Sequence, residues 1–319
     1  MKKVLILGAS GFIGKNICIN LEKKNYSIFG TYFKNKPKKI SNIKYLKADL
    51  TNKNQVNKIF KQMDIVIQAA AVTGGIKDAK KRPAKYIADN AIMNSIILES
   101  IYKNNIKHFI FLSCSVMYHS SKKPLKENDF NPKGRIYPSY FGGAWNKIYI
   151  EKMCEYYSRI SKTKFTVLRH SNVYGPYDKF DLEKSHVCAA TINKIYDDKV
   201  NKSITVWGNG KEKRDLLFVE DLAEAIKLSL INQKKVFEIF NIGSNNLISV
   251  KNLVKKIIKL SNRNINIKFD IRKPTNKFSV ALNCSKARKL LKWEPKYTID
   301  QGLLKTINWY KKKYLSNVK

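Results

Sequence analysis

Carboxylates, glycine and proline are all scarce in this sequence. Its 319 residues include 24 acidic side chains against 62 basic ones, with 14 glycines and 8 prolines. So little glycine and proline argues against extended disorder. A chain of this length with 44% hydrophobic residues can bury one large core or two closely joined ones. Long apolar runs are also missing, because "VLILGA" and "HFIFL" are far too short to cross a bilayer.

The amino-terminal segment "MKKVLILGASGFIGKN" has the basic start of a signal peptide but lacks its other parts. The short apolar run at residues 3–8 leads into a glycine-rich turn, without a small-residue cleavage site. This pattern predicts a buried strand, and we expect a cytoplasmic protein.

The five cysteines, Cys18, Cys114, Cys154, Cys188 and Cys284, are widely dispersed and form no C-x-x-C pair. An odd, scattered set indicates neither a disulfide framework nor a zinc site. We therefore expect no bound metal, and small buried thiols at most of these positions.

The formal net charge of +38 would attract polyanions, including nucleic acid and anionic lipid. The lysines are spread along the whole chain, however, without an arginine-rich stripe or a nucleic-acid-binding motif. We expect the charge to reflect a lysine-rich composition together with a preference for phosphorylated small molecules, with no specific nucleic-acid partner. The rival hypothesis is a nucleic-acid binder, whose affinity for duplexes would rise steeply as salt is lowered.

Apolar runs of strand length alternate with helix-like periodicity as far as about residue 175. The predicted strands cover residues 3–8, 26–32, 42–50, 64–71, 108–115 and 165–175, and the predicted helices 13–24, 52–61, 83–104 and 141–160. This alternation is typical of β-α-β units. We predict an α/β fold with a Rossmann-type doubly wound parallel sheet over residues 1–175. Residues 176–319 are expected to form mainly a smaller C-terminal α/β lobe for the substrate, with some return of the chain to the sheet.

Three glycines follow the first predicted strand in "LILGASGFIG". Gly8 permits a tight turn, Gly11 lets the backbone approach a pyrophosphate, and Gly14 lets the next helix pack closely on the strand. The helix N-terminus adds free N–H groups and a partial positive charge for an anion. The turn predicts a dinucleotide site, and a purely structural glycine turn is the alternative.

The residues after the second strand bear on the choice of cofactor. An acidic side chain there would bind the ribose 2′-hydroxyl of NAD. The sequence "GTYFKNKPKK" instead offers lysines, among them Lys34, and no carboxylate. This favours NADP over NAD, unless the lysines only reflect the general excess. Asp49 in "KADL" is expected to face the adenine, and its alternative role is the N-cap of the next helix.

Several longer motifs resemble one known family. The segments "GASGFIG", "ADL", "AAA", the serine cluster of the fifth strand and "SNVYGP" are similar to the extended short-chain dehydrogenase/reductases, the NAD-dependent epimerase/dehydratase family, which act on nucleotide sugars. Within that family, residues 70–95 with Gly74 and Gly75, "SNVYGPYDKFDLEKSHV" and "VWGNGKEKRDLLFVEDLA" resemble the GDP-L-fucose synthases. Those enzymes are epimerase-reductases of GDP-4-keto-6-deoxymannose.

The resemblance implies which residues hold the cofactor. They belong to the glycine turn, to the ends of the second, third and fourth strands and to one later helix: Gly8, Ser10, Gly11, Phe12, Ile13, Gly14, Lys34, Asp49, Leu50, Ala69, Ala70, Ala71 and Lys147. The resembled enzymes are typically homodimers through the helices at 83–104 and 141–160, so we expect a homodimer.

The resemblance also implies that a nucleotide sugar contacts Asn172, Trp207 and Arg214. Arginine suits a bidentate clamp on a diphosphate. The alternatives are a turn-forming Asn172 and an ion pair between Arg214 and Asp215.

The family's catalytic residues are only partly present. Its Tyr-x-x-x-Lys pair puts both side chains on one helix face, and the lysine favours the phenolate for acid–base work. Lys147 is in place, but Gly143 stands where the tyrosine belongs. The serine position is Cys114, the proposed epimerisation cysteine falls on Val116, and the family's histidine is kept as His186.

Three explanations of these changes stay open. Tyr140 could serve if a bulge at the two glycines shortened the helix, because it otherwise lies about 10 Å along the axis from Lys147. Cys114 or His186 could instead abstract a proton beside a keto group, as in an epimerase without hydride transfer. Third, the site could be degenerate, leaving an NAD(P)-binding protein.

We expect an NADP-linked nucleotide-sugar epimerase/reductase acting on a GDP-4-keto-6-deoxyhexose in the synthesis of sugars for surface polysaccharides. The catalytic residues would be drawn from Lys147, His186, Cys114 and Tyr140. The alternatives are the degenerate binder and an epimerase or dehydratase of another nucleotide sugar.

Overall fold

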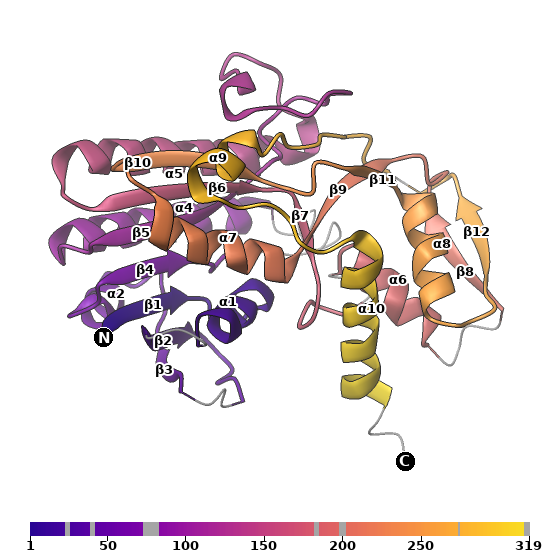
Figure 1. The fold of residues 1–319 in the computed structure, drawn as a ribbon, viewed down its shortest axis with the longest axis horizontal. Helices are drawn as coiled ribbons and strands as arrows, with labels where there is room; N and C mark the ends of the chain where they lie inside the picture. Colours follow the sequence, from indigo (N-terminus) through magenta and orange to yellow (C-terminus); the bar gives the residue numbers. More distant parts are fainter. Residues whose placement is uncertain are drawn as a thin grey trace.

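A computed structural model describes residues 1–22, 26–38, 42–72, 83–181, 185–197, 202–273 and 275–315 (Figure 1). A seven-stranded parallel sheet between helices forms the larger lobe, on the left of Figure 1, and two small sheets with their helices form the second lobe on the right. The predicted α/β fold with a doubly wound parallel sheet is confirmed.

The strands of the large sheet stand in the order β10–β6–β5–β4–β1–β2–β3, and every neighbouring pair is parallel. Their bounds are β1 Lys2–Leu7, β2 Tyr26–Tyr32, β3 Lys44–Lys47, β4 Ile65–Gln68, β5 His108–Cys114, β6 Lys164–His170 and β10 Phe237–Ile242. The chain builds outward from β1 on one side and then returns to its other side at β4. Ligands of such sheets bind at this switch point, beyond the carboxyl ends of the strands.

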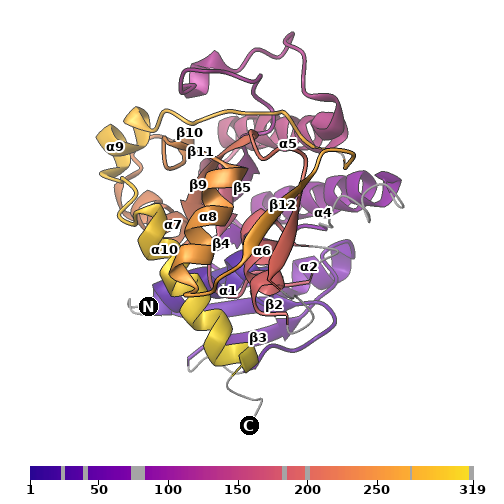
Figure 2. The same ribbon diagram turned by 90° about the vertical axis from the view of Figure 1, so that its right-hand side faces the viewer.

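Helices cover both faces of the large sheet, as Figure 2 shows edge-on. One face carries α2 Lys53–Phe60, α4 Pro83–Lys103 and α5 Phe141–Ile160, and the other carries α1 Phe12–Glu22, α7 Val219–Asn232 and α9 Ser285–Leu291. Strand β1 shows why both faces must be covered. Val4 and Ile6 point into one core, while Leu5 and Leu7 point into the other.

The second lobe joins two small sheets to three helices and a π-helical turn. Its elements are β7 Asn172–Tyr174, α6 Val187–Ile195, β8 Ser203–Trp207, β9 Lys213–Phe218, β11 Leu247–Ser249, α8 Val250–Leu260, β12 Asn266–Asp270, α10 Ile299–Tyr310 and the turn Lys311–Leu315. Strand order is β11–β9–β7 in one sheet and β12–β8 in the other. A core rich in aromatic side chains, including Phe180 and Tyr310, holds these elements together.

The structure departs from the predicted elements in one place. The single strand predicted over residues 165–175 is two strands, because the chain leaves the large sheet at Ser171 and β7 pairs with β9 instead. Both halves are buried, so their apolar pattern does not show the change of sheet. The chain also returns to the larger lobe through α7, β10 and α9, which lie next to α1 and β6. Gly74 and Gly75 lie outside the described residues.

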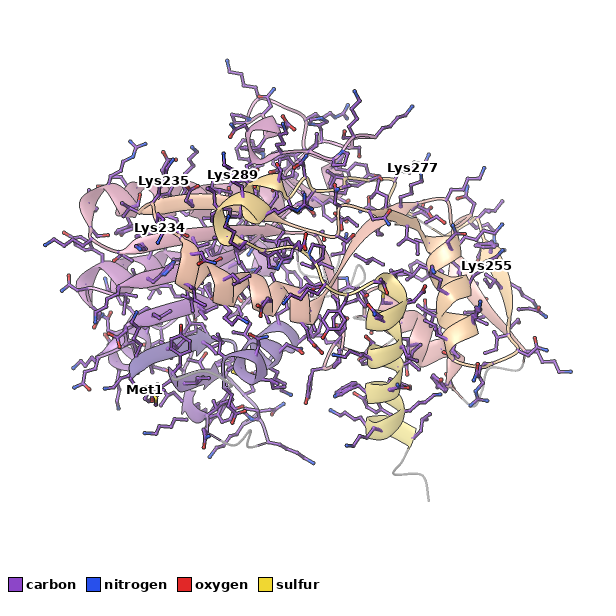
Figure 3. The ribbon with its side chains drawn as sticks, viewed as in Figure 1. Met1, Lys234, Lys235, Lys255, Lys277 and Lys289 are labelled. Atoms are coloured by element: carbon purple, nitrogen blue, oxygen red, sulfur yellow. The ribbon has the colours of Figure 1, made fainter. Side chains whose placement is uncertain are left out.

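Basic side chains project from both lobes in Figure 3, with Lys234, Lys235 and Lys289 on the larger and Lys255 and Lys277 on the smaller. In the parts of the chain that are described, no helix is long and apolar enough to cross a bilayer. The same parts contain no cluster of three or more histidine, cysteine or carboxylate side chains that could hold a metal ion.

A buried ion pair lies beneath the carboxyl edge of the large sheet. Arg169 on β6 and Glu151 on α5 each have a side chain that is only 5% exposed. The guanidinium donates to both carboxylate oxygens and to the Tyr118 hydroxyl, and Ser113 donates to Glu151 from β5. The network therefore joins α5 to the ends of two strands, and each of its two buried charges is the direct ion-pair partner of the other.

We predict that Glu151→Gln lowers the free energy of unfolding by about 3 kcal/mol, because it leaves the Arg169 guanidinium buried without a counter-charge. Glu155→Gln on the same helix is the matched control, since Glu155 pairs with the exposed Lys152 and Arg159 and should cost less than about 1 kcal/mol. Urea denaturation measures both variants. Equal losses of unfolding free energy in the two variants would contradict the prediction that the buried pair stabilises the fold more than the exposed pairs do.

Candidate active site

The turn between β1 and α1 has the geometry that its glycine spacing predicts. Gly8 has φ of 76°, and a Cβ there would lie 2.7 Å from the Ala70 Cα atom. A Cβ on Gly14 would lie 2.2 Å from the Gly8 carbonyl oxygen, so neither position admits a side chain. The N-terminus of α1 is thereby held against the carboxyl end of β1. Its free N–H groups face the place where a dinucleotide diphosphate would fit.

The structure groups the predicted cofactor residues at the switch point. Ala69 donates its N–H to the Leu7 carbonyl at 3.1 Å, so the alanines that follow β4 lie beside the glycine turn. The remaining predicted residues of the turn, Ser10, Phe12 and Ile13, are half-buried there, and Gly11 is exposed. Leu50 is buried after β3.

Lys34 and Asp49 follow the adjacent strands β2 and β3. The Lys34 side chain is exposed, with its ammonium 6.0 Å from the Phe33 ring centroid. Asp49 accepts hydrogen bonds from the Thr51 N–H at 2.9 Å and the Thr51 hydroxyl at 2.7 Å. The N-cap of α2 is Asn52, so the alternative role of Asp49 as that cap is wrong.

Lys147 lies on the inner side of α5. Its ammonium donates to the Leu112 carbonyl at 2.7 Å and lies 4.5 Å from the Phe111 ring centroid. Burial lowers the pKa of Lys147, and the nearby Cys114 and Glu151 oppose part of that shift. The ammonium is therefore already at the carboxyl edge of β5, where the resemblance expects it.

Gly143 leaves open space where a tyrosine would stand. Helix α5 runs without interruption through both glycines, so the bulge that the first of the three explanations requires does not form. A Cβ on Gly143 would meet no atom within 4 Å, whereas one on Gly142 would lie 2.8 Å from the Ile87 Cδ1 atom. The helix itself could thus carry a side chain at position 143.

Tyr140 faces the site from a 3₁₀ turn, Pro138–Tyr140, that precedes α5. Its ring packs edge-on against Phe278, with centroids 5.4 Å apart. Burial raises the pKa of the Tyr140 phenol, while Arg214 and a side-chain hydrogen bond with Asn276 oppose the shift. Cys114 is close enough to add to it. Tyr140 therefore reaches the site without the bulge, between Cys114 and Arg214.

Cys114 and His170 end the neighbouring strands β5 and β6 in register with each other. Burial raises the pKa of the Cys114 thiol, with Lys147 opposing, so the thiol is protonated at neutral pH. Burial lowers the pKa of His170 to about 4, and its Nδ1 hydrogen-bonds the Ser171 carbonyl at 2.8 Å. Sequence reasoning missed His170, although a polar last residue of a central strand could have indicated it.

Arg214 holds one wall of the site. Its guanidinium donates to the carbonyls of Asn276 and Phe278, both at 2.9 Å. The alternative of an ion pair with Asp215 is wrong, because that carboxylate is buried and accepts from Ser244 and Leu282. No sequence signal linked residues 276–278 to the site.

Asn172 is a strand residue rather than a turn former. It lies in β7 and donates to the Asp215 carbonyl at 3.1 Å. The turn-forming alternative for Asn172 is therefore wrong.

A cavity of about 480 Å³ adjoins the Arg214 wall. Its lining comes from the β8–β9 connection and from the segment after β12: Gly208, Asn209, Lys211, Glu212, Lys213, Ile271, Thr275, Lys277 and Ser279. Trp207 ends β8 directly before this lining and is 38% exposed. Three lysines and one glutamate are among the lining residues, so the lining carries a net positive charge, which suits a phosphorylated ligand.

His186 is the N-cap residue of α6 and its side chain is exposed. It belongs to the second lobe, whereas Lys147 and Cys114 belong to the first. The predicted catalytic residues thus come from both lobes, and the structure gives no direct contact between His186 and the other three.

The chain belongs to the NAD dependent epimerase/dehydratase family, whose model matches residues 4–243. The resemblance stated from the motifs is therefore confirmed at the level of the family.

Curated relatives match the chain over nearly its whole length. It is 27% identical to the GDP-L-colitose synthase of Yersinia pseudotuberculosis, covering 97% of each chain. It is 29% identical to the GDP-L-fucose synthase of Sinorhizobium fredii, covering 99% of this chain and 96% of the relative.

Solved structures show the same fold. The UDP-glucose 4-epimerase of Thermotoga maritima superposes with a TM-score of 0.86 at 23% identity, covering 97% of this chain and 99% of that one. The UDP-glucuronic acid 4-epimerase of Bacillus cereus superposes with a TM-score of 0.84 at 24% identity, covering 98% and 100%.

Proposed function

We propose that this protein is an NADP-linked enzyme that epimerises a nucleotide-activated keto sugar, with or without reducing it. The substrate class is a GDP-4-keto-6-deoxyhexose, which fits the names of the curated relatives. The observation that carries the proposal is the meeting of Lys147, Cys114 and Tyr140 at one edge of the sheet, beside Arg214. The expected place in surface-polysaccharide synthesis stays a proposal.

The cofactor assignment rests on the chain's own residues. The β1–α1 turn fits a diphosphate because Gly8 and Gly14 exclude side chains from it. The exposed Lys34 follows β2, where a 2′-phosphate would need a cation and where "FKNKPKK" offers no carboxylate. When bound, NADPH would supply the hydride for a reduction. NAD is the alternative cofactor.

The resting protonation states suggest separate roles for the acid–base residues. Burial keeps the Cys114 thiol and the Tyr140 phenol protonated, so both can donate a hydrogen bond to a keto oxygen as it gains negative charge. The exposed His186 can accept the proton from the neighbouring sugar carbon. Lys147 would contact the cofactor ribose and stabilise negative charge on the oxygen. Trp207, Asn172 and Arg214 would hold the nucleotide.

A second candidate function is supported by Gly143. Without a tyrosine on the face of Lys147, the protein would be an NAD(P)-binding protein that has lost catalysis. It would bind cofactor, turn over no nucleotide sugar and tolerate Lys147→Ala in its biological role.

The homodimer also stays a proposal, and exposed apolar side chains on two long helices support it. They are Ile87, Ile92 and Tyr102 on α4, with Phe141, Trp145, Tyr149 and Tyr156 on α5. A second copy of the chain would cover this face.

We predict that GDP-4-keto-6-deoxymannose incubated with the protein and NADPH in deuterated water takes up deuterium beside its keto group, as mass spectrometry would show. His186→Gln should slow the uptake at least about 100-fold, because it removes the proposed base. Lys289→Gln is the control, because Lys289 lies on the outer surface of the larger lobe in Figure 3, and it should leave the rate unchanged. If this and several related nucleotide sugars show neither deuterium uptake nor NADPH consumption, the substrate assignment is wrong and the binding protein is favoured.

We also predict that Gly143→Tyr increases the rate of NADPH oxidation with the keto sugar by at least about tenfold, because a phenol then faces Lys147 from the usual helix position. A Cβ at position 143 meets no atom within 4 Å, so the backbone of α5 does not oppose the substitution. Gly143→Phe is the matched control, with the same bulk and no hydroxyl, and should give no gain. Equal rates for the two variants would contradict the role given to the missing hydroxyl.

A further inference from the structure

Asp178 is a buried carboxylate whose hydrogen bonding is incomplete. It is 8% exposed, and its Oδ1 accepts from the Lys179 N–H at 2.7 Å. Its Oδ2 is fully buried and has no hydrogen-bond partner within the described ranges. A buried polar atom without a partner costs free energy and requires an explanation.

The segment that carries Asp178 is fixed by both lobes. Asn16 on α1 donates to the Pro176 carbonyl at 3.0 Å, and the Tyr177 ring lies 4.9 Å from that of Trp309 on α10. Tyr177 is held in the left-handed region with φ of 69°. Non-glycine residues keep such a conformation only where their surroundings enforce it, often near functional sites. The position of Asp178 is therefore set by contacts of its segment with both lobes.

His186 lies close enough to this carboxylate to interact with it electrostatically. Burial raises the pKa of Asp178, and the attraction of His186 is the largest effect opposing it. The other charged or titratable groups that face Asp178 are Lys179 in the same loop and the Cys188 thiol on α6. The His186 side chain is exposed at the start of α6, so packing in the core does not fix its rotamer.

We infer that Asp178 is the positioning residue of His186: its Oδ2 accepts a hydrogen bond from the imidazole, and the other ring nitrogen then faces the sugar. This inference rests on the proposed function for its catalytic meaning, since it names the group that orients the proposed base. A carboxylate in this place fixes the tautomer of the ring and stabilises the imidazolium formed when the base accepts a proton. This role would also explain why the fold buries the Asp178 Oδ2 atom, which has no hydrogen-bond partner within the described ranges.

Imidazole NMR of the free protein tests the pair without any substrate. Burial lowers the pKa of His108 to about 3 and that of His170 to about 4. The signals to follow are those of the other two imidazoles, His119 and His186. Asp178→Asn should lower the titration midpoint of His186 by about one pH unit, because the carboxylate favours the charged ring. His119 should not move.

Glu294→Gln, which removes an exposed carboxylate elsewhere, is the charge-matched control and should leave both signals in place. The reciprocal variant His186→Gln should raise the midpoint of the Asp178 carboxyl by a similar amount, and it keeps the test possible if Asp178→Asn does not fold. An unchanged His186 midpoint in Asp178→Asn, or an unchanged Asp178 midpoint in His186→Gln, would overturn the inference.

The deuterium exchange separates this inference from the proposed function. If exchange occurs, Asp178→Asn should shift the acidic limb of its pH–rate profile down by about one unit, as the basicity of His186 falls. Exchange with an unmoved profile would refute the pair while the function stands. Absence of exchange together with the NMR shift would refute the function while the pair stands.

Discussion

The close approach of Gly14 to the Gly8 carbonyl is the constraint on which the other features depend. With a Cβ only 2.2 Å from that oxygen, any side chain at position 14 would push α1 away from β1. Because Gly14 has no side chain, the positive end of α1 lies at the switch point between β1 and β4. Lys147, Cys114 and His170 come to the same edge of the sheet because β5, β6 and α5 pack behind it.

The carboxyl edge of the sheet, where we propose the active site, is held by a buried ion pair and lacks a side chain at position 143. Below it, the Glu151–Arg169 pair links α5 to β6, so the helix that carries Lys147 cannot shift independently of the strand that carries His170. At position 143 there is no side chain, and Tyr140, just before α5, packs against Phe278 and interacts with Arg214. The Lys147 ammonium, the Cys114 thiol and the Tyr140 phenol therefore lie at one edge of the sheet. The phenol comes from the turn before α5 and not from position 143 of the helix.

Sequence patterns predicted those parts that depend on local periodicity. The alternation of Val4, Leu5, Ile6 and Leu7 between two cores, the bounds of α5 and the role of Gly14 all follow from spacing along one segment. The parts that were missed depend on contacts between distant segments. The split of the sixth strand at Ser171, the wall at residues 276–278 and the open oxygen of Asp178 have no local signature, because tertiary packing creates them.

The central claim is that the amino end of α1 binds the diphosphate of a nicotinamide dinucleotide. Calorimetric titration of the folded protein with NADPH and with NADH tests it most directly. The account predicts saturable binding of one dinucleotide per chain, with NADPH about tenfold tighter because a lysine after β2 can bond its 2′-phosphate. Failure of the folded protein to bind either dinucleotide would contradict the account.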